Sequence, residues 1–296
     1  MAGTAVWLVP ALTSNLLYGV GQGLVKKNIA DVHPARFCLY FTAAKLILNP
    51  LYYLAFSKTP LFAPEAAAFS KTCLVAYILD GTGWLLYFQA IVYGPIAIVG
   101  TLSAAYPALT VLFAGFFLGE ALAGLQYFGV ALVIGGCVGL SYAPSPPGSR
   151  PINPRWIPLS FMALALWGTS GTLLKHAYTL PGADEANVLI FNMIGGVLTL
   201  GTYGILKGLA GSHTRHEWAS SFLPMGMMVG GDIGFIVATR YGPVSLTSPI
   251  SGAYPLVTLV FARFVLNERI GLMQYACIAA ILGGMVFAPG AIRWPW

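Results

Sequence analysis

Charged residues are scarce in this chain of 296 residues, making up 8% of it against 57% for hydrophobic residues. Soluble globular domains carry about 25% charged residues. Because so little charge cannot cover so much apolar side chain in water, the composition excludes a soluble protein. We therefore expect an all-α, multi-pass integral membrane protein. No segment is typical of organelle targeting, so the plasma (inner) membrane is the expected location.

Cysteine and clustered charge are also rare. The four cysteines lie in apolar segments at unrelated spacings, which excludes a disulfide framework or a zinc site: Cys38, Cys73, Cys137 and Cys277. The net charge of +6 is spread over loops and helix ends, without the basic cluster typical of nucleic-acid binding. We expect no metal, no cofactor and no nucleic-acid partner. The expected partners are membrane lipid and a small-molecule substrate.

What the chain has in abundance is apolar segments long enough to cross a bilayer, which takes about 20 residues. We predict ten transmembrane helices, at residues 5–27, 35–57, 71–92, 95–117, 122–142, 157–177, 186–208, 219–239, 243–265 and 271–289. Only short loops remain between them. A soluble catalytic domain therefore has no room.

One long segment occurs twice. The sequence from Tyr93 to Val138 returns from Tyr241 at an offset of 241 − 93 = 148, with 19 of 46 aligned positions identical. Five helices per copy is an odd number, so the second copy crosses the membrane in the opposite sense, as in inverted-repeat transporters. We predict a first repeat at 1–143, a proline-rich linker at 144–155 and a second repeat at 156–296.

Ionisable residues inside membrane spans are costly and often functional. Asp80 precedes the Gly-Pro pair at Gly94 by 94 − 80 = 14 residues, and Asp232 precedes the pair at Gly242 by 242 − 232 = 10. The difference of four is close to one helical turn, about 3.6 residues, so both carboxylates can face one cavity and bind an amine or a proton. Hydrogen bonding to a neighbouring helix is the structural alternative. Lys45 is also mid-span and is a further candidate substrate contact, with Asp80 as its expected ion-pair partner.

The tripeptide Ala-Tyr-Pro recurs mid-span in both copies. Pro107 and Pro255 each remove a backbone hydrogen bond, which is tolerable only against protein or a water-lined cavity. They are predicted hinge or kink residues, and Tyr106 and Tyr254 are predicted substrate contacts. Further polar and aromatic candidates for the same cavity, each of which could instead join helices, are Asn15, Trp84 and Gln89.

These features resemble the drug/metabolite transporter superfamily, specifically its EamA branch. The resemblance rests on Trp167 and Gly168 with Lys175 seven residues after Gly168, on the recurring Tyr-Pro, and on the endings Leu118–Glu120 and Leu266–Glu268. It implies ten helices, a central cavity lined by the first four of each repeat, and a peripheral fifth and tenth helix. It also implies carriage of amino acids, choline-like amines, sugars or other metabolites, often by export. The chain departs from the pattern at Asn267, which replaces a glycine, and at Tyr18, which replaces a tryptophan.

Together these observations predict a secondary-active or facilitative transporter of small metabolites such as amino acids or amines, working by alternating access. A lipid scramblase or channel-like facilitator is the alternative. An intramembrane aspartyl protease is disfavoured, because Leu79 before Asp80 and Val229 before Asp232 break the motifs of that class.

The orientation of the chain and its oligomeric state are less constrained. Lys and Arg counted by loop, eight on one face and five on the other, place both termini outside. The family resemblance implies cytoplasmic termini, which we take as the expectation. Glycine pairs in the fifth and tenth spans fit either internal packing or dimerisation, so the chain is expected to be a monomer or a homodimer.

Overall fold

The computed structural model describes residues 6–28, 32–93, 105–140, 154–209, 215–265, 267 and 271–287. Within these ranges the chain is helical and contains no strand. The helices of the first repeat are α1 (Leu8–Asn28), α2 (Pro34–Phe56), α3 (Ala67–Tyr93), α5 (Tyr106–Leu118) and α6 (Gly124–Leu140), with a 3-10 turn at Pro64–Ala66.

The second repeat has the corresponding set of helices. They are α7 (Trp156–Ala177), α8 (Glu185–Gly196), α9 (Arg215–Tyr241), α10 (Val244–Gly252), α11 (Tyr254–Val265) and α12 (Leu272–Phe287). Two π-helical turns, Val197–Gly201 and Gly204–Gly208, extend α8. Every predicted span therefore contains helix among the described residues, which confirms the fold class. Most of the predicted linker lies outside these residues.

The structure refines the prediction about the two prolines. The ninth span is two half-helices, because α10 ends at Gly252 and α11 starts at Tyr254. Pro255 and Pro107 are each the second residue of the helix that follows, α11 and α5. A proline in the first turn loses no helical hydrogen bond, since those N–H groups have no partner inside the helix. In the second repeat the interruption falls at Ala253, two residues before Pro255. The hinge role of both prolines stays a prediction.

Several helices are long and apolar enough to cross a membrane. In the described part of the chain these are 35–56, 156–177, 185–208, 215–241 and 244–265. Shorter apolar helices lie at 106–118, 124–139 and 272–287.

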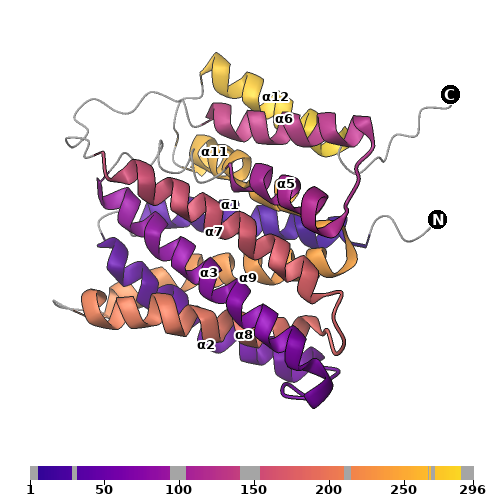
Figure 1. Ribbon diagram of the computed structural model, residues 1–296. Coiled ribbons are helices and arrows are strands. Elements are labelled where there is room, and N and C mark those ends of the chain that lie inside the picture. The colour runs from indigo at the N-terminus through magenta and orange to yellow at the C-terminus, as the bar shows by residue number, and fades with distance from the viewer. Residues whose placement is uncertain are drawn as a thin grey trace.

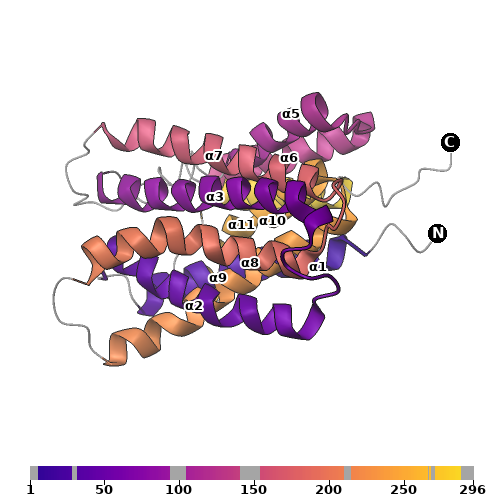
Figure 2. The ribbon, with the colours of Figure 1, turned by 60° about the horizontal axis from the view of Figure 1, so that its bottom comes forward.

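A pseudo-two-fold axis relates the two repeats, and their helices interleave rather than forming two separate halves side by side. Helix α1 packs on α9 as α7 packs on α3, α2 packs on α9 as α8 packs on α3, and α1 packs on α11 as α7 packs on α5. Figure 1 shows α6 beside α12 at one edge and α2 beside α8 at the opposite edge. Figure 2 shows α3 and α7 in one layer and α2, α8 and α9 in the other. Each layer therefore contains helices of both repeats.

The contact between α6 and α12 follows the same pseudo-two-fold symmetry at the level of single residues. A Cβ on Gly136 would lie 2.6 Å from Ile281, and a Cβ on Gly284 would lie 2.8 Å from Val133, the equivalent pair at the 148-residue offset. Gly135 and Gly283 have nothing within 4 Å of that position. Internal packing therefore accounts for Gly136 and Gly284, since small residues let helices in membranes approach closely.

Asn267, which departs from the family pattern, has the same backbone conformation as Gly119, its counterpart in the first repeat. Gly119 ends α5 with a φ of 66°, and Asn267 has a φ of 56°. Both lie in the left-handed region, which glycine adopts freely and asparagine tolerates better than most residues because its short side chain can hydrogen-bond locally. The turn after the helix therefore survives the substitution.

Candidate functional site

A cavity of about 60 Å³ lies between the two repeats. Helices α1, α3 and α5 of the first repeat and α7, α8, α9 and α11 of the second repeat contribute to its wall. Its lining residues are Tyr18, Tyr77, Asp80, Trp84, Tyr106, Trp167, Ser170, Gly171, Leu174, Asn192, Asp232, Phe235, Ile236 and Tyr254. Five of the predicted substrate contacts are among them: Asp80, Asp232, Tyr106, Tyr254 and Trp84. Whether they bind substrate remains a prediction.

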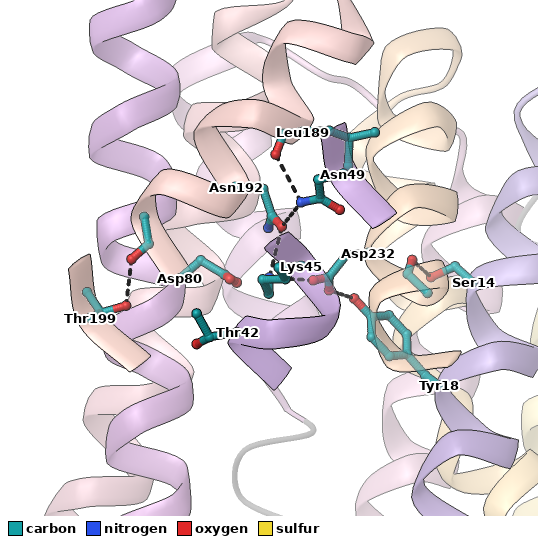
Figure 3. Close-up of polar contacts among 12 residues, drawn as sticks. Ser14, Tyr18, Thr42, Lys45, Asn49, Asp80, Leu189, Asn192, Thr199 and Asp232 are labelled. Carbon is teal, nitrogen blue, oxygen red and sulfur yellow. Dashed lines mark hydrogen bonds and ion pairs between the residues drawn. The ribbon is translucent and has the colours of Figure 1, made fainter. Parts of the chain in front are cut away.

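Lys45 lies directly behind this wall and is 1% exposed. Its Nζ donates to an Asp232 carboxylate oxygen at 2.6 Å and to Asn192 Oδ1 at 2.9 Å, and it lies 4.6 Å from the centre of the Phe41 ring. Asn49, one turn further along α2, also donates to Asn192 Oδ1 at 2.9 Å. The cation and Asn192 are thus fixed by contacts between α2, α8 and α9 (Figure 3).

The predicted ion pair between Lys45 and Asp80 is therefore wrong. Lys45 pairs with Asp232, which belongs to the other repeat. The repeats dock with α2 against α9, so the nearest acid in space is not the acid nearest in the sequence. The Tyr18 hydroxyl donates to the other oxygen of Asp232. Asp232 is thus held by contacts from both α1 and α2.

Asp80 has a different environment. In Figure 3, Asp80 and Asp232 lie on either side of Lys45, and only Asp232 is joined to it. Among the described residues, the Asp80 carboxylate has no hydrogen-bond or ion-pair partner. The Trp167 Nε1–H donates to the backbone carbonyl of Asp80 at 3.2 Å, and not to the Asp80 carboxylate. The cavity therefore combines one buried cation with two acids.

Aromatic rings form much of the remaining wall. The Trp84 and Trp167 rings meet edge to face with centroids 4.9 Å apart, and Tyr106 packs on Trp167 at 5.9 Å. Tyr254 packs on Tyr18 at 5.8 Å. These contacts come from helices of both repeats. The wall can hold an apolar body or a cation over a ring face.

Two predicted contacts lie elsewhere. Asn15 donates to the carbonyl of Ile250 at 2.7 Å and joins α1 to α10. Gln89 hydrogen-bonds to the Tyr203 side chain. Neither Asn15 nor Gln89 lines the cavity. Both contacts join helices, which is the commoner role of polar residues in membrane spans. Substrate binding by either residue stays a prediction.

Sequence reasoning also missed some lining residues. Tyr18 and Trp167 occupy aligned positions in the two repeats, and that alignment could have found them. Asn192 could also have been identified, because it is a polar residue within an apolar span. Tyr77 precedes Asp80 by three residues and therefore lies on the same face of α3.

A carboxylate of the first repeat caps a half-helix of the second. Glu120 accepts from the backbone N–H of Val244 at 3.0 Å and of Ser245 at 2.9 Å, and from the Ser245 hydroxyl at 2.5 Å. These groups start α10, where a helix leaves N–H groups unpaired and favours negative charge. Lys175 in turn donates to the carbonyls of Thr239 and Gly242 at 3.1 and 2.7 Å, at the end of α9.

Comparison with known proteins gives two findings. Residues 5–142 and 154–288 each match the EamA-like transporter family. A crystal structure of another protein superposes with a TM-score of 0.75 over 95% of both chains, at 20% sequence identity. At that identity the likeness shows the fold alone.

Proposed function

Because this chain belongs to the EamA-like transporter family, matched by both of its halves, we propose that it carries small metabolites such as amino acids or amines across the membrane. The carrier is secondary-active or facilitative and works by alternating access. Its substrate binds in the cavity between the repeats. The proposed location is the plasma (inner) membrane, with both termini cytoplasmic.

The observation that carries this proposal is the origin of the cavity wall. Corresponding helices of both repeats line it: α1 with α7, α3 with α9, and α5 with α11. In inverted-repeat transporters the substrate site lies at such an interface, and rocking of one repeat against the other exposes it to each side in turn. A site lined by helices of both halves would be exposed to each side in turn by that motion.

The break between α10 and α11 supports the same proposal. Discontinuous helices near the middle of the membrane are typical of transporter substrate sites. Here Tyr254, the first residue after the break, lines the cavity. The half-helix α10 is buried along its whole length, so its irregular end is shielded from lipid by protein.

Flux into proteoliposomes tests the proposal. Purified protein should give saturable uptake and counter-exchange of at least one member of a panel of amino acids, amines, nucleosides and sugars, above protein-free liposomes. A scramblase would instead move labelled lipid between leaflets, and a channel would give flux without saturation or counter-exchange. Either result would contradict alternating access.

A steric variant connects flux to the cavity. Gly171 lines the cavity, and a Cβ placed on it would approach no atom closer than 3.5 Å, so Gly171→Leu should fill the cavity without distorting the helices. We expect this variant to lose saturable flux. The matched control is Gly135→Leu, since Gly135 has nothing within 4 Å of its Cβ position and lies outside the cavity. Equal flux through both variants would place the pathway elsewhere.

A further inference from the structure

The charges around the cavity do not balance. Lys45 contributes one positive charge, while Asp80 and Asp232 contribute two negative charges. Asp232 is already paired with Lys45 and bonded to Tyr18. Among the described residues that line the cavity, none is Lys, Arg or His. The site therefore lacks one positive charge, and the shortfall is at Asp80.

A carboxylate at this depth needs a counter-charge. The effective penalty for moving one ion out of water into a protein interior is several kcal/mol. For Asp80 the nearby charge of Lys45 offsets only part of it, and no hydrogen bond to the carboxylate is present among the described residues. In contrast, three side chains stabilise the Asp232 and Lys45 pair: Tyr18, Asn192 and Phe41. A bound cation would supply the missing interaction.

The shape and chemistry of the wall favour an organic cation. Trp84 lies one turn from Asp80 on α3, Trp167 packs on Trp84, and Tyr106 packs on Trp167. Aromatic faces attract ammonium groups and pack against hydrocarbon. The described residues contain no group of three or more His, Cys, Asp or Glu side chains that could hold a metal ion. Asp80 with these rings therefore fits a small amine better than an inorganic cation.

Tyr77 adds a hydrogen-bonding group that is unpaired among the described residues. It lines the cavity, is 5% exposed, and its hydroxyl has no partner among the described residues. Leaving a buried hydroxyl unpaired costs about 1–3 kcal/mol. Because Tyr77 and Asp80 are three residues apart on one helical face, an ammonium N–H held by Asp80 is within the reach of Tyr77 as acceptor.

We propose that the cargo is a protonated amine without a carboxylate, and that its ammonium group binds Asp80 between Tyr77 and Trp84. The proposal rests on the transport function above and narrows it. An amino acid would bring its own carboxylate into a cavity where Asp80 has no ion-pair partner among the described residues and Lys45 is committed to Asp232. Like charges brought together in a desolvated site repel, so the zwitterion is disfavoured.

A matched ligand set tests this proposal. Leucine, isoamylamine, 3-methyl-1-butanol and 4-methylpentanoate share one branched side chain and carry zwitterionic, cationic, neutral and anionic heads. Phenylalanine, phenethylamine and 3-phenylpropionate repeat the comparison with an aromatic body. At neutral pH these amines are protonated, as the lysine side chain is. Binding to the purified protein is measured by quenching of tryptophan fluorescence and by thermal shift.

We expect each amine to bind at least about tenfold more tightly than its parent amino acid, alcohol or acid, as loss of one charge-assisted hydrogen bond implies. Asp80→Asn should remove the preference and Asp80→Glu should retain it. The matched control is Glu65→Gln, which neutralises an exposed acid in the 3-10 turn before α3 and should change nothing. Size-exclusion profiles confirm that each variant is folded.

Tyr77→Phe gives a second readout that does not alter charge. It should weaken phenethylamine, which can donate N–H groups, and leave its N,N,N-trimethyl derivative unchanged. Amino acids that bind as tightly as the amines, or Asp80→Asn protein that binds amines like the wild type, would overturn the proposal. Saturable flux of an amino acid or sugar in that case would leave the transport function standing, whereas absence of saturable flux for the whole panel would overturn both.

Discussion

Asp80 in α3 and Asp232 in α9 lie in corresponding helices of the two repeats, yet their surroundings differ. Asp232 is 6% exposed and bonded to Tyr18 and Lys45. Asp80 is less buried, and its carboxylate has no partner within the described residues. One acid is part of the structure that joins the repeats. The other is available to a ligand.

The symmetry of the fold explains how this difference arose. At the 148-residue offset Asp232 corresponds to Trp84, since 232 − 148 = 84. Asp232 contacts Tyr18, and Trp84 contacts Trp167, which is the counterpart of Tyr18. The same inter-repeat contact is therefore polar on one side and aromatic on the other. Divergence at one pair of positions gives the cavity a charged end and an aromatic end without changing the frame.

The largest expected effect comes from neutralising each acid in turn. Asp232→Asn leaves Lys45 as a buried cation without its counter-ion, and breaking a buried pair in this way costs about 3–5 kcal/mol. Asp80→Asn removes a desolvated charge that has no hydrogen-bond or ion-pair partner among the described residues, so stability should be unchanged or increased. Thermal and denaturant unfolding in detergent micelles measures both.

The double variant Lys45→Met with Asp232→Leu is the control for this comparison. Replacing a buried ion pair with apolar residues of similar size is often neutral or stabilising, so this protein should unfold near the wild-type temperature. If Asp80→Asn destabilised as much as Asp232→Asn, Asp80 would be structural as well. The contrast between the two acids would then be lost.

Two tyrosine hydroxyls in the cavity wall give the next largest difference. Tyr18→Phe removes a hydrogen bond to the charged Asp232, with an expected cost of about 1.5–3 kcal/mol. Tyr77→Phe removes a hydroxyl that has no partner in the described structure, so stability should be unchanged or increased. The same unfolding measurement compares the two variants. A loss of stability in Tyr77→Phe would show that its hydroxyl is bonded.

Neighbouring glycines of α12 test whether the symmetric frame is as tight as its geometry indicates. A Cβ on Gly284 would lie 2.5 Å from the carbonyl oxygen of Gly129, so Gly284→Ala forces α6 and α12 apart, and overpacking of this kind costs about 1–3 kcal/mol. Gly136→Ala should behave alike, because its Cβ would lie 2.9 Å from the Cys277 carbonyl. Gly283→Ala is the control and should leave stability unchanged or slightly raised, since alanine is the better helix former.

The sequence predicted the frame more fully than the site. Composition and the repeat predicted ten helices in two copies, because apolar length and internal identity depend on neighbours in the chain. The partner of Lys45 was predicted wrongly, because the choice between Asp80 and Asp232 depends on how the repeats dock. Asn15 and Gln89 were placed in the cavity for a related reason: a polar residue within a span shows that it needs a partner, but not which helix supplies it.

Glu120 gives the smallest expected effect and shows how the two repeats are joined outside the cavity. Its carboxylate belongs to the first repeat but binds the start of α10 in the second. Glu120→Gln keeps one acceptor and loses the charge, so we expect a cost of about 1 kcal/mol, as for a carboxylate near a helix N-terminus. Glu65→Gln, which changes an exposed side chain, should cost nothing measurable. Because the Glu120 contact crosses between the repeats, loosening it should also change the flux rate, whereas Gly135→Leu should not. An unchanged rate with lowered stability would restrict Glu120 to a role in folding, and the motion between the repeats would then have to be sought at the contacts of Tyr18 and Asp232.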